Sequence, residues 1–155
     1  ITGASVGIGH ATAEAFLGEG FAVFNLARRA CPIAAVTNLT CDLANAETID
    51  RCIDTLQATL AQSSEIALVH NAIQMRKDSA AACDSDSLQQ VLATNVVAIN
   101  SLNQRLLPLM PAGSSVLYVG STLAEKAVRN SFSYVISKHA QLGMMRATCV
   151  VPVGT

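Results

Sequence analysis

The chain has 155 residues, of which 51% are hydrophobic and 14% charged, and its formal net charge at pH 7 is −1. This composition predicts one domain over residues 1–155 with a sizeable core. No basic cluster is larger than the pair Arg28-Arg29, which argues against a nucleic-acid partner or an anionic membrane surface. Five cysteines show neither CxxC spacing nor a metal-ligand pattern with the three histidines. We therefore expect a cytoplasmic protein without a metal site.

The first nine residues predict a phosphate-binding turn. They read Ile-Thr-Gly-Ala-Ser-Val-Gly-Ile-Gly and lead into a helical pattern in which Ile8, Ala11, Ala15 and Phe16 share one face. Small residues let the backbone approach a pyrophosphate, whose charge is then stabilised by the free amides at the helix start. An ordinary glycine-rich turn between a strand and a helix is the alternative interpretation.

The next elements alternate between strand and helix. Residues 21–26 form a short apolar run typical of a strand, and residues 46–60 carry a helical stripe with Asn45 as a possible N-cap. Residues 66–70 predict a strand that leads into Asn71. This alternation predicts an α/β fold, a doubly wound parallel sheet with helices on both faces.

The second half continues this alternation. Apolar positions from Leu88 to Leu106 predict one long helix that ends before Pro108, with Asn95 on its apolar stripe. The uncharged run over residues 106–124 is interrupted by prolines, glycine and serines, so we predict a helix end, a loop and a strand over residues 116–119 rather than a membrane span. Ser121 then follows the carboxyl end of that strand, where parallel sheets hold ligands.

A last helix is expected over residues 131–147, and it carries Tyr134 and Lys138 one turn apart on the same face. A phenol has an ordinary pKa of about 10, so it exchanges protons near neutral pH only where a nearby charge stabilises the phenolate. An ammonium can supply that charge. The alternative is a tyrosine ring at the core edge beside a solvated amine.

Two patterns together resemble the short-chain dehydrogenase/reductase family. One is the TGxxxGxG pattern of residues 2–9, and the other is Ser121 thirteen residues before Tyr134, with Lys138 four residues after it. Asn95 is similar to the asparagine that completes the family's catalytic tetrad. The resemblance covers residues 2–138 and implies a Rossmann-like fold.

The resemblance also implies a dinucleotide site. The implied cofactor-binding residues are Gly3, Ser5, Gly7, Ile8, Gly9, Arg28, Arg29, Asp42, Leu43, Asn71, Ala72, Tyr134, Lys138 and Pro152. Asp42-Leu43 is similar to the family's pair beside the adenine, and Asn71-Ala72 to part of its NNAG motif. His70 and Ile73 depart from that motif, and Val153 interrupts the loop that contains Pro152.

The implied reaction is hydride transfer between a nicotinamide and a small-molecule carbonyl or alcohol. Tyr134 would be the general acid or base, and Ser121 would hydrogen-bond the substrate oxygen. Lys138 would hold the nicotinamide ribose, and Asn95 would fix a water on the proton path from Lys138. The resemblance further implies a homodimer or homotetramer. The alternative function is a non-catalytic NADP(H)-binding sensor or assembly module.

Residues 27–29 favour NADP(H) over NAD(H). Proteins that prefer NAD commonly place a carboxylate after this strand to hold the ribose 2′-hydroxyl, whereas this chain has Ala27 followed by two arginines that suit a 2′-phosphate. Solvated arginines are the alternative. Val6 stands where NADP-dependent relatives often carry a basic residue, and Asp42 has a second interpretation as a helix cap.

The chain is shorter than the family's usual length of about 250 residues, which single α/β domains readily reach. The resemblance places Ile1-Thr2 at the end of a first strand, and residues 149–155 follow the last helix almost without a connection. We therefore expect a fold that is incomplete at both ends, with segments missing before residue 1, near residues 149–150 and after residue 155.

Overall fold

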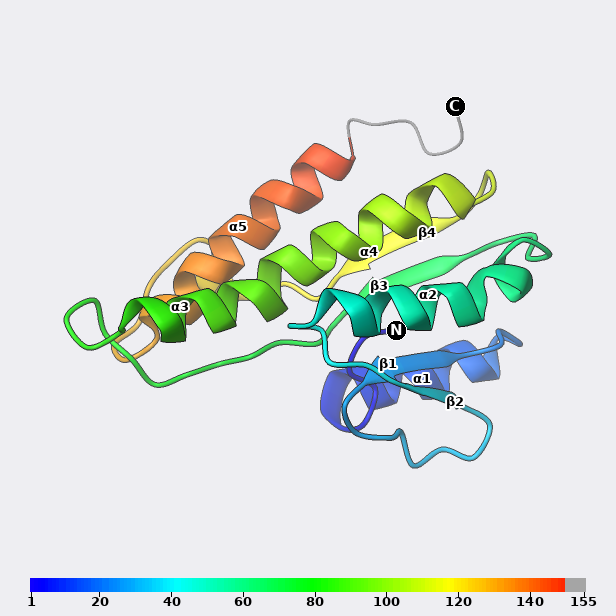
Figure 1. Cartoon of the computed structure of the whole chain (residues 1–155), viewed down its shortest axis with the longest axis horizontal. Helices are drawn as coiled ribbons and strands as arrows, with labels where there is room; N and C mark the ends of the chain where they lie inside the picture. Colours follow the sequence, from blue (N-terminus) through cyan, green and yellow to red (C-terminus); the bar gives the residue numbers. More distant parts are fainter. Residues whose placement is uncertain (150–155) are drawn as a thin grey trace.

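The computed structural model describes residues 1–149, in which four short parallel strands form two two-stranded sheets that the segment around Thr2 joins into one layer (Figure 1). The strands are β1 (Phe24–Ala27), β2 (Thr37–Thr40), β3 (Ala67–His70) and β4 (Ser115–Tyr118). β1 pairs with β2, and β3 pairs with β4. Thr2 joins the two pairs, because it bridges to Leu26 of β1 and its backbone N donates to Val69 O of β3 at 2.9 Å.

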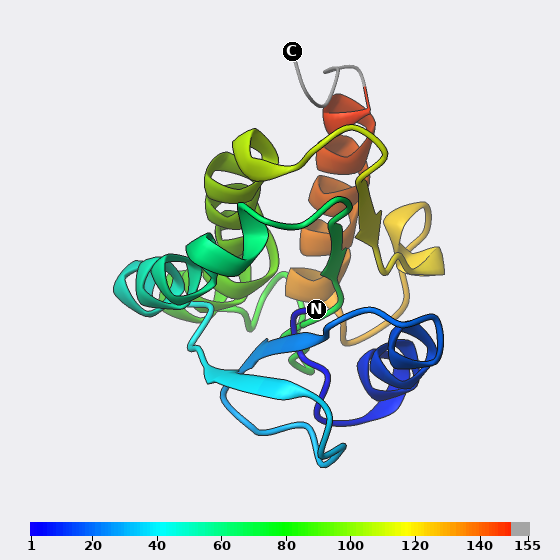
Figure 2. The same ribbon diagram turned by 90° about the vertical axis from the view of Figure 1, so that its right-hand side faces the viewer.

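Helices cover both faces of this sheet. The α-helices are α1 (Gly7–Gly18), α2 (Ala46–Leu60), α3 (Ser85–Leu92), α4 (Ala98–Leu106) and α5 (Phe132–Thr148). A π-helical turn (Ala93–Val97) joins α3 to α4, and 3-10 turns cover Leu107–Leu109 and Thr122–Ala124. Figure 2 shows α1 on the side of the sheet opposite α2 and α4. This is the doubly wound α/β arrangement that the alternation predicts.

Two hydrophobic clusters hold the layers together. The larger lies between the sheet and helices α2 and α4, and its buried members include Leu26, Ile49, Ile53, Leu68 and Leu102. The smaller lies under α1 and is built on Ala4, Ala13, Val23, Cys31 and Val36. Helices α2 and α4 each bury an apolar stripe in the larger cluster, and the carboxyl ends of the strands are left for polar residues.

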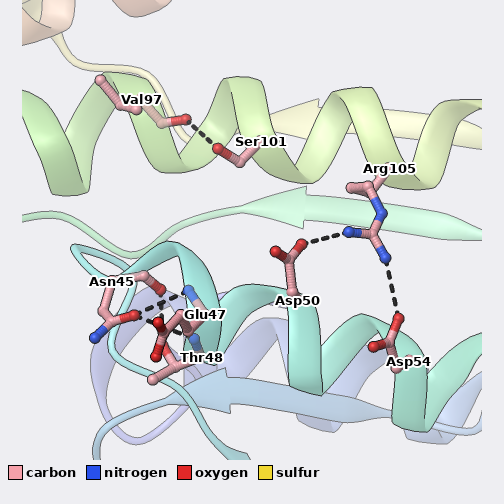
Figure 3. Close-up of polar contacts among 8 residues, drawn as sticks. All are labelled: Asn45, Glu47, Thr48, Asp50, Asp54, Val97, Ser101 and Arg105. Carbon is pink, nitrogen blue, oxygen red and sulfur yellow. Dashed lines mark hydrogen bonds and ion pairs between the residues drawn. The ribbon is translucent and has the colours of Figure 1, made fainter.

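Polar contacts at the surface cap the start of α2 and link α2 to α4 (Figure 3). The side-chain oxygen of Asn45 accepts from the backbone N of Glu47 at 2.9 Å, which confirms Asn45 as the N-cap of α2. Arg105 of α4 forms ion pairs with Asp50 and Asp54 of α2. Because these three side chains are about half exposed, we assign the pairs little stability, on the order of 0–1 kcal/mol each.

The predicted elements are recovered with three differences. The predicted strand over residues 21–26 forms at residues 24–27, and β2 escapes prediction because Thr-Asn-Leu-Thr is polar and largely exposed. The single helix expected over residues 88–106 is divided by the π-helical turn that contains Asn95, where backbone hydrogen bonds join residues five apart instead of four. No helix within residues 1–149 is long and apolar enough to cross a membrane.

A buried polar chain connects β3, α4, β4 and α5. His70 Nε2 donates to the Asn103 side-chain oxygen at 2.8 Å, and the Asn103 amide donates to the Tyr118 hydroxyl, also at 2.8 Å. Tyr118 in turn lies 3.1 Å from the Thr148 hydroxyl. Burial lowers the pKa of His70 to about 4, although the hydrogen bond to Asn103 opposes this shift. His70 is therefore held in its neutral form.

This lowered pKa predicts a loss of stability in acid. The unfolded chain binds a proton at His70 near pH 6.5, whereas the folded chain resists it until about pH 4. The stability that neutral His70 provides is present above pH 6.5 and falls between pH 6.5 and 4, by about 3 kcal/mol in total. Urea unfolding of wild type and His70→Gln across this range should show that the wild type loses more stability. Parallel curves would contradict the prediction.

Candidate functional site

The glycine turn lies at the carboxyl ends of the strands and opens directly into α1. Gly3 and Gly7 have φ of +72° and +61°, a backbone conformation that other residues rarely adopt. A Cβ on Gly9 would lie 2.3 Å from Gly3 O and 2.4 Å from Asn71 Nδ2, so only glycine fits there. Val6, at the N-cap, gives α1 no side-chain cap, which leaves the first amides of α1 free to bind an anion.

Thr2 and Asn71 fasten the glycine turn to β3. The Thr2 hydroxyl accepts from the backbone N of Asn71 and of Ala72, both at 3.0 Å. In return, Asn71 Nδ2 donates to Thr2 O at 3.0 Å and to Gly3 O at 2.8 Å. The predicted cofactor-binding pair Asn71-Ala72 therefore lies against the turn, and the Asn71 amide supports the shape of the turn.

Asn25, which sequence reasoning missed, connects the same turn to the arginine segment. Its side-chain oxygen accepts from Ala4 N at 2.8 Å, and its amide donates to Arg29 O at 3.1 Å and to Asn38 Oδ1 at 2.8 Å. Asn25 is fully buried within an otherwise apolar strand. A buried amide must be hydrogen-bonded, so its place in that strand was a signal that could have identified it.

A cavity of about 320 Å³ opens beside the turn. Its lining contains most of the predicted cofactor-binding residues, namely Gly3, Ser5, Ile8, Arg28, Arg29, Asp42, Leu43, Asn71 and Ala72. Val6, Ala27 and Ile73, which belong to the segments predicted from the sequence, also line the cavity, and sequence reasoning missed Cys41, Gln74 and Thr94. The cavity thus combines free amides at a helix start with two guanidinium groups, a donor set that fits the phosphates of a dinucleotide.

Asp42 belongs to this cavity and does not cap α2. Its carboxylate accepts from Ala44 N at 3.1 Å within the loop, while Asn45 caps the helix. The second interpretation of Asp42, as a helix cap, is therefore wrong, because the chain turns once more before α2 begins. Within residues 1–149, no cluster of three or more His, Cys, Asp or Glu could hold a metal ion.

Asn95 lies in the π-helical turn and is fully buried. Its side-chain oxygen accepts from Gln74 N at 2.7 Å, and its amide donates to Gln74 O at 2.8 Å and to the Ser137 hydroxyl at 2.9 Å. Ser137 lies on α5 between Tyr134 and Lys138. Asn95 therefore joins three segments: the loop after β3, the π-helical turn and α5.

Lys138 and Tyr134 lie on α5 as the spacing predicts. Lys138 Nζ is 5.8 Å from the centroid of the Tyr134 ring. The ammonium donates to Val119 O at 2.7 Å and to the Gln141 side-chain oxygen at 2.8 Å. Lys138 is only 4% exposed, and burial lowers its pKa. The alternative of a solvated amine is therefore wrong.

Ser121 follows β4 and caps the short 3-10 turn, where its hydroxyl oxygen accepts from Leu123 N at 3.1 Å. Ser121 and Lys138 line a common cavity of about 130 Å³, together with Gln141. The structure thus brings together a hydroxyl from the segment after β4 and an ammonium from α5. Pro152 and the break expected near residues 149–150 lie outside the described residues.

A carboxylate from a loop distant in the sequence binds the first residues of the helix that bears Tyr134. Asp78, which sequence reasoning missed, accepts from Ser133 N at 3.0 Å and from the Ser133 hydroxyl, and its backbone O accepts from Phe132 N at 3.3 Å. The Ser131 hydroxyl donates to Val128 O and does not cap the helix. Asp78 thus accepts hydrogen bonds from donors at the start of α5, and its negative charge interacts favourably with the positive end of the helix dipole.

Solved structures with the same fold include three dehydrogenases or oxidoreductases. The ligand-free aldohexose dehydrogenase of Thermoplasma acidophilum is 27% identical, with a TM-score of 0.88, covering 96% of this chain and 58% of that protein. A 4-hydroxyisoleucine dehydrogenase complexed with NADH is 25% identical, with a TM-score of 0.83 and coverages of 96% and 66%. A metagenomic short-chain oxidoreductase in complex with NADP is 23% identical, with a TM-score of 0.86 and coverages of 96% and 71%.

The chain thus spans between 58% and 71% of the lengths of these relatives. A comparison with curated protein sequences gave no match. The family model described as "short chain dehydrogenase" matches residues 1–150. With the glycine turn, Asn95, Ser121, Tyr134 and Lys138 in the arrangement described above, the chain belongs to the short-chain dehydrogenase/reductase family.

Proposed function

We propose that this chain is the cofactor-binding and catalytic part of an NADP(H)-dependent oxidoreductase that acts on a carbonyl or a secondary alcohol. The observation that supports the proposal most directly is the Lys138 ammonium, which is buried 5.8 Å from the Tyr134 ring centroid and shares a cavity with Ser121. Within residues 1–149, no carboxylate forms an ion pair with this ammonium. Its charge is therefore available to stabilise a phenolate.

We assign each residue of the candidate tetrad a role in this reaction. Tyr134 gives a proton to the carbonyl oxygen during reduction and takes it back during alcohol oxidation. Ser121 donates a hydrogen bond to the oxygen as negative charge develops there. Lys138 uses two of its three N–H donors on Val119 O and Gln141, so one remains for a ligand oxygen. Asn95 holds the π-helical turn against α5 through Ser137.

The 320 Å³ cavity is where we expect the dinucleotide to bind. The first amides of α1 would hold the pyrophosphate, and Arg28 and Arg29 would hold the adenosine half through its 2′-phosphate. When bound, the nicotinamide supplies or accepts the hydride. The relatives solved with NADH and with NADP make either cofactor reasonable for the fold, and the two arginines favour NADP(H).

The catalytic role of Tyr134 can be tested with Tyr134→Phe. General acid–base catalysis contributes roughly a hundredfold to ten-thousandfold, so turnover should fall at least a hundredfold. The Kd for NADPH, measured by fluorescence titration, should change by less than about twofold, since the cavity lining is unaltered. NADPH oxidation with a panel of aldehydes and ketones supplies the rate. Turnover that survives the substitution would rule out Tyr134 as the acid.

The same panel separates the enzyme from the sensor. NADPH-induced thermal stabilisation of the wild type without turnover of any carbonyl or alcohol would favour the non-catalytic module.

The cofactor preference can be tested with Arg28→Ala and Arg29→Ala. Each guanidinium is exposed, so we expect a loss of about tenfold in NADPH affinity per substitution, near the lower limit for a charge-assisted pair. NADH affinity should remain within twofold, because NADH lacks the 2′-phosphate. Arg51→Ala on α2 is the matched control for loss of one exposed arginine. Equal weakening of NADH and NADPH would contradict a 2′-phosphate contact.

A further inference from the structure

Gln141 occupies a special position beside the catalytic lysine. It lies one turn after Lys138 on α5, and the residue is only 6% exposed. Its amide oxygen accepts from Lys138 Nζ at 2.8 Å, and its amide nitrogen donates to Asn95 O at 2.7 Å. One side chain therefore bridges two residues of the candidate tetrad.

The chemistry of the two ends determines which side chain can form this bridge. An ammonium only donates and a backbone carbonyl only accepts, so the bridging group needs an acceptor at one end and a donor at the other. Glutamine meets both requirements. A carboxylate would lack the donor for Asn95 O, and an apolar side chain would leave both buried groups without this partner.

We propose that Gln141 is a positioning residue that takes the place of the expected water between Lys138 and Asn95 and holds the ammonium beside Tyr134. This inference rests on the proposed function, because it assigns the group that orients its lysine. Val119 O, directly after β4, provides the second fixed acceptor, at 2.7 Å. The two acceptors come from different elements and leave the third N–H of the ammonium for the ligand.

An amide bridge differs from a water in one respect that matters for catalysis. A water accepts and donates through the same oxygen, so it can receive one proton and release another. The Gln141 amide accepts on oxygen and donates from nitrogen, and passing a proton through it would require a protonated carbonyl oxygen followed by loss of an N–H proton. The bridge therefore fixes the lysine but carries no proton. After Tyr134 gives its proton to the carbonyl oxygen, the replacement proton from solvent reaches it by a path that excludes Asn95.

Gln141→Leu and Gln141→Ala together separate a polar bridge from simple packing. Leucine fills the space and leaves Lys138 and Asn95 O without the bridge. Alanine leaves a polar space with a donor and an acceptor, where a water can restore both contacts. A polar bridge therefore makes alanine the milder change. If Gln141 only filled space, alanine would be the more harmful change, since it creates a cavity.

The first readout needs neither cofactor nor substrate. The chain contains three lysines, Lys77, Lys126 and Lys138, so their side-chain ¹³Cε signals can be followed by NMR against pH in the 155-residue protein. The titratable groups near Lys138 are Tyr134 on its own helix and Tyr118 and Glu125, which line the same cavity, and all three are unchanged in the variants. Gln104→Leu, at an exposed site on α4, is the control for an added leucine.

We expect the Lys138 titration midpoint to fall by about one to two pH units in Gln141→Leu, because the ammonium loses an acceptor, and to stay near the wild-type value in Gln141→Ala. An unchanged midpoint in Gln141→Leu, or a larger shift in Gln141→Ala, would overturn the proposal.

The second readout is turnover of any carbonyl that the wild type reduces. Gln141→Leu should lower kcat roughly tenfold or more with KM for the carbonyl within about twofold, and Gln141→Ala should lose less. A fall in kcat that is larger for alanine would overturn the polar bridge. If the wild type reduces no carbonyl in the panel, the proposed function fails, while the NMR titration still decides whether Gln141 holds Lys138.

Discussion

The structure depends on the contact between Thr2 and Asn71. Thr2 lies between the two parallel strand pairs: its backbone N donates to Val69 O, while its neighbours Ile1 and Gly3 hydrogen-bond Leu26 of β1. Asn71 returns two hydrogen bonds to the backbone of the glycine turn. This contact sets where the glycine turn lies relative to β3, and therefore where α1 begins. The same contact explains why Gly9 tolerates no side chain, since a Cβ there would collide with the Asn71 amide and Gly3 O.

Buried amides play a similar role throughout the site. Asn25 connects the glycine turn to the arginine segment, Asn95 connects the π-helical turn to α5, and Gln141 connects Asn95 to Lys138. Each has both a donor and an acceptor, so each can satisfy backbone groups or a charge that would otherwise be buried without a partner. The apolar clusters beneath provide the hydrophobic stabilisation, whereas these amides determine the shape of the site.

Much of the fold could be predicted from local patterns. The apolar stripes of α2 and α4 and the Asn45 cap depend on residues within one or two turns of each other, which the sequence displays directly. β2 could not be predicted, because its Thr-Asn-Leu-Thr sequence is largely exposed and takes its extended form from pairing with β1. The π-helical turn could not be predicted either, because the apolar residues of α3, the turn and α4 follow one continuous helical spacing in the sequence.

The sequence by itself determined the candidate chemistry: the glycine turn, the spacing of Ser121, Tyr134 and Lys138, and the arginine pair. These are short-range features in which residue type and spacing specify the possible reaction. Only the tertiary structure decided what supports them, such as the Asp78 carboxylate at the start of α5 and the Gln141 bridge to Asn95. Those partners lie 55 and 46 residues apart in the chain. Hydrogen bonds between such distant residues follow no periodic pattern, and they form only when packing brings the elements together.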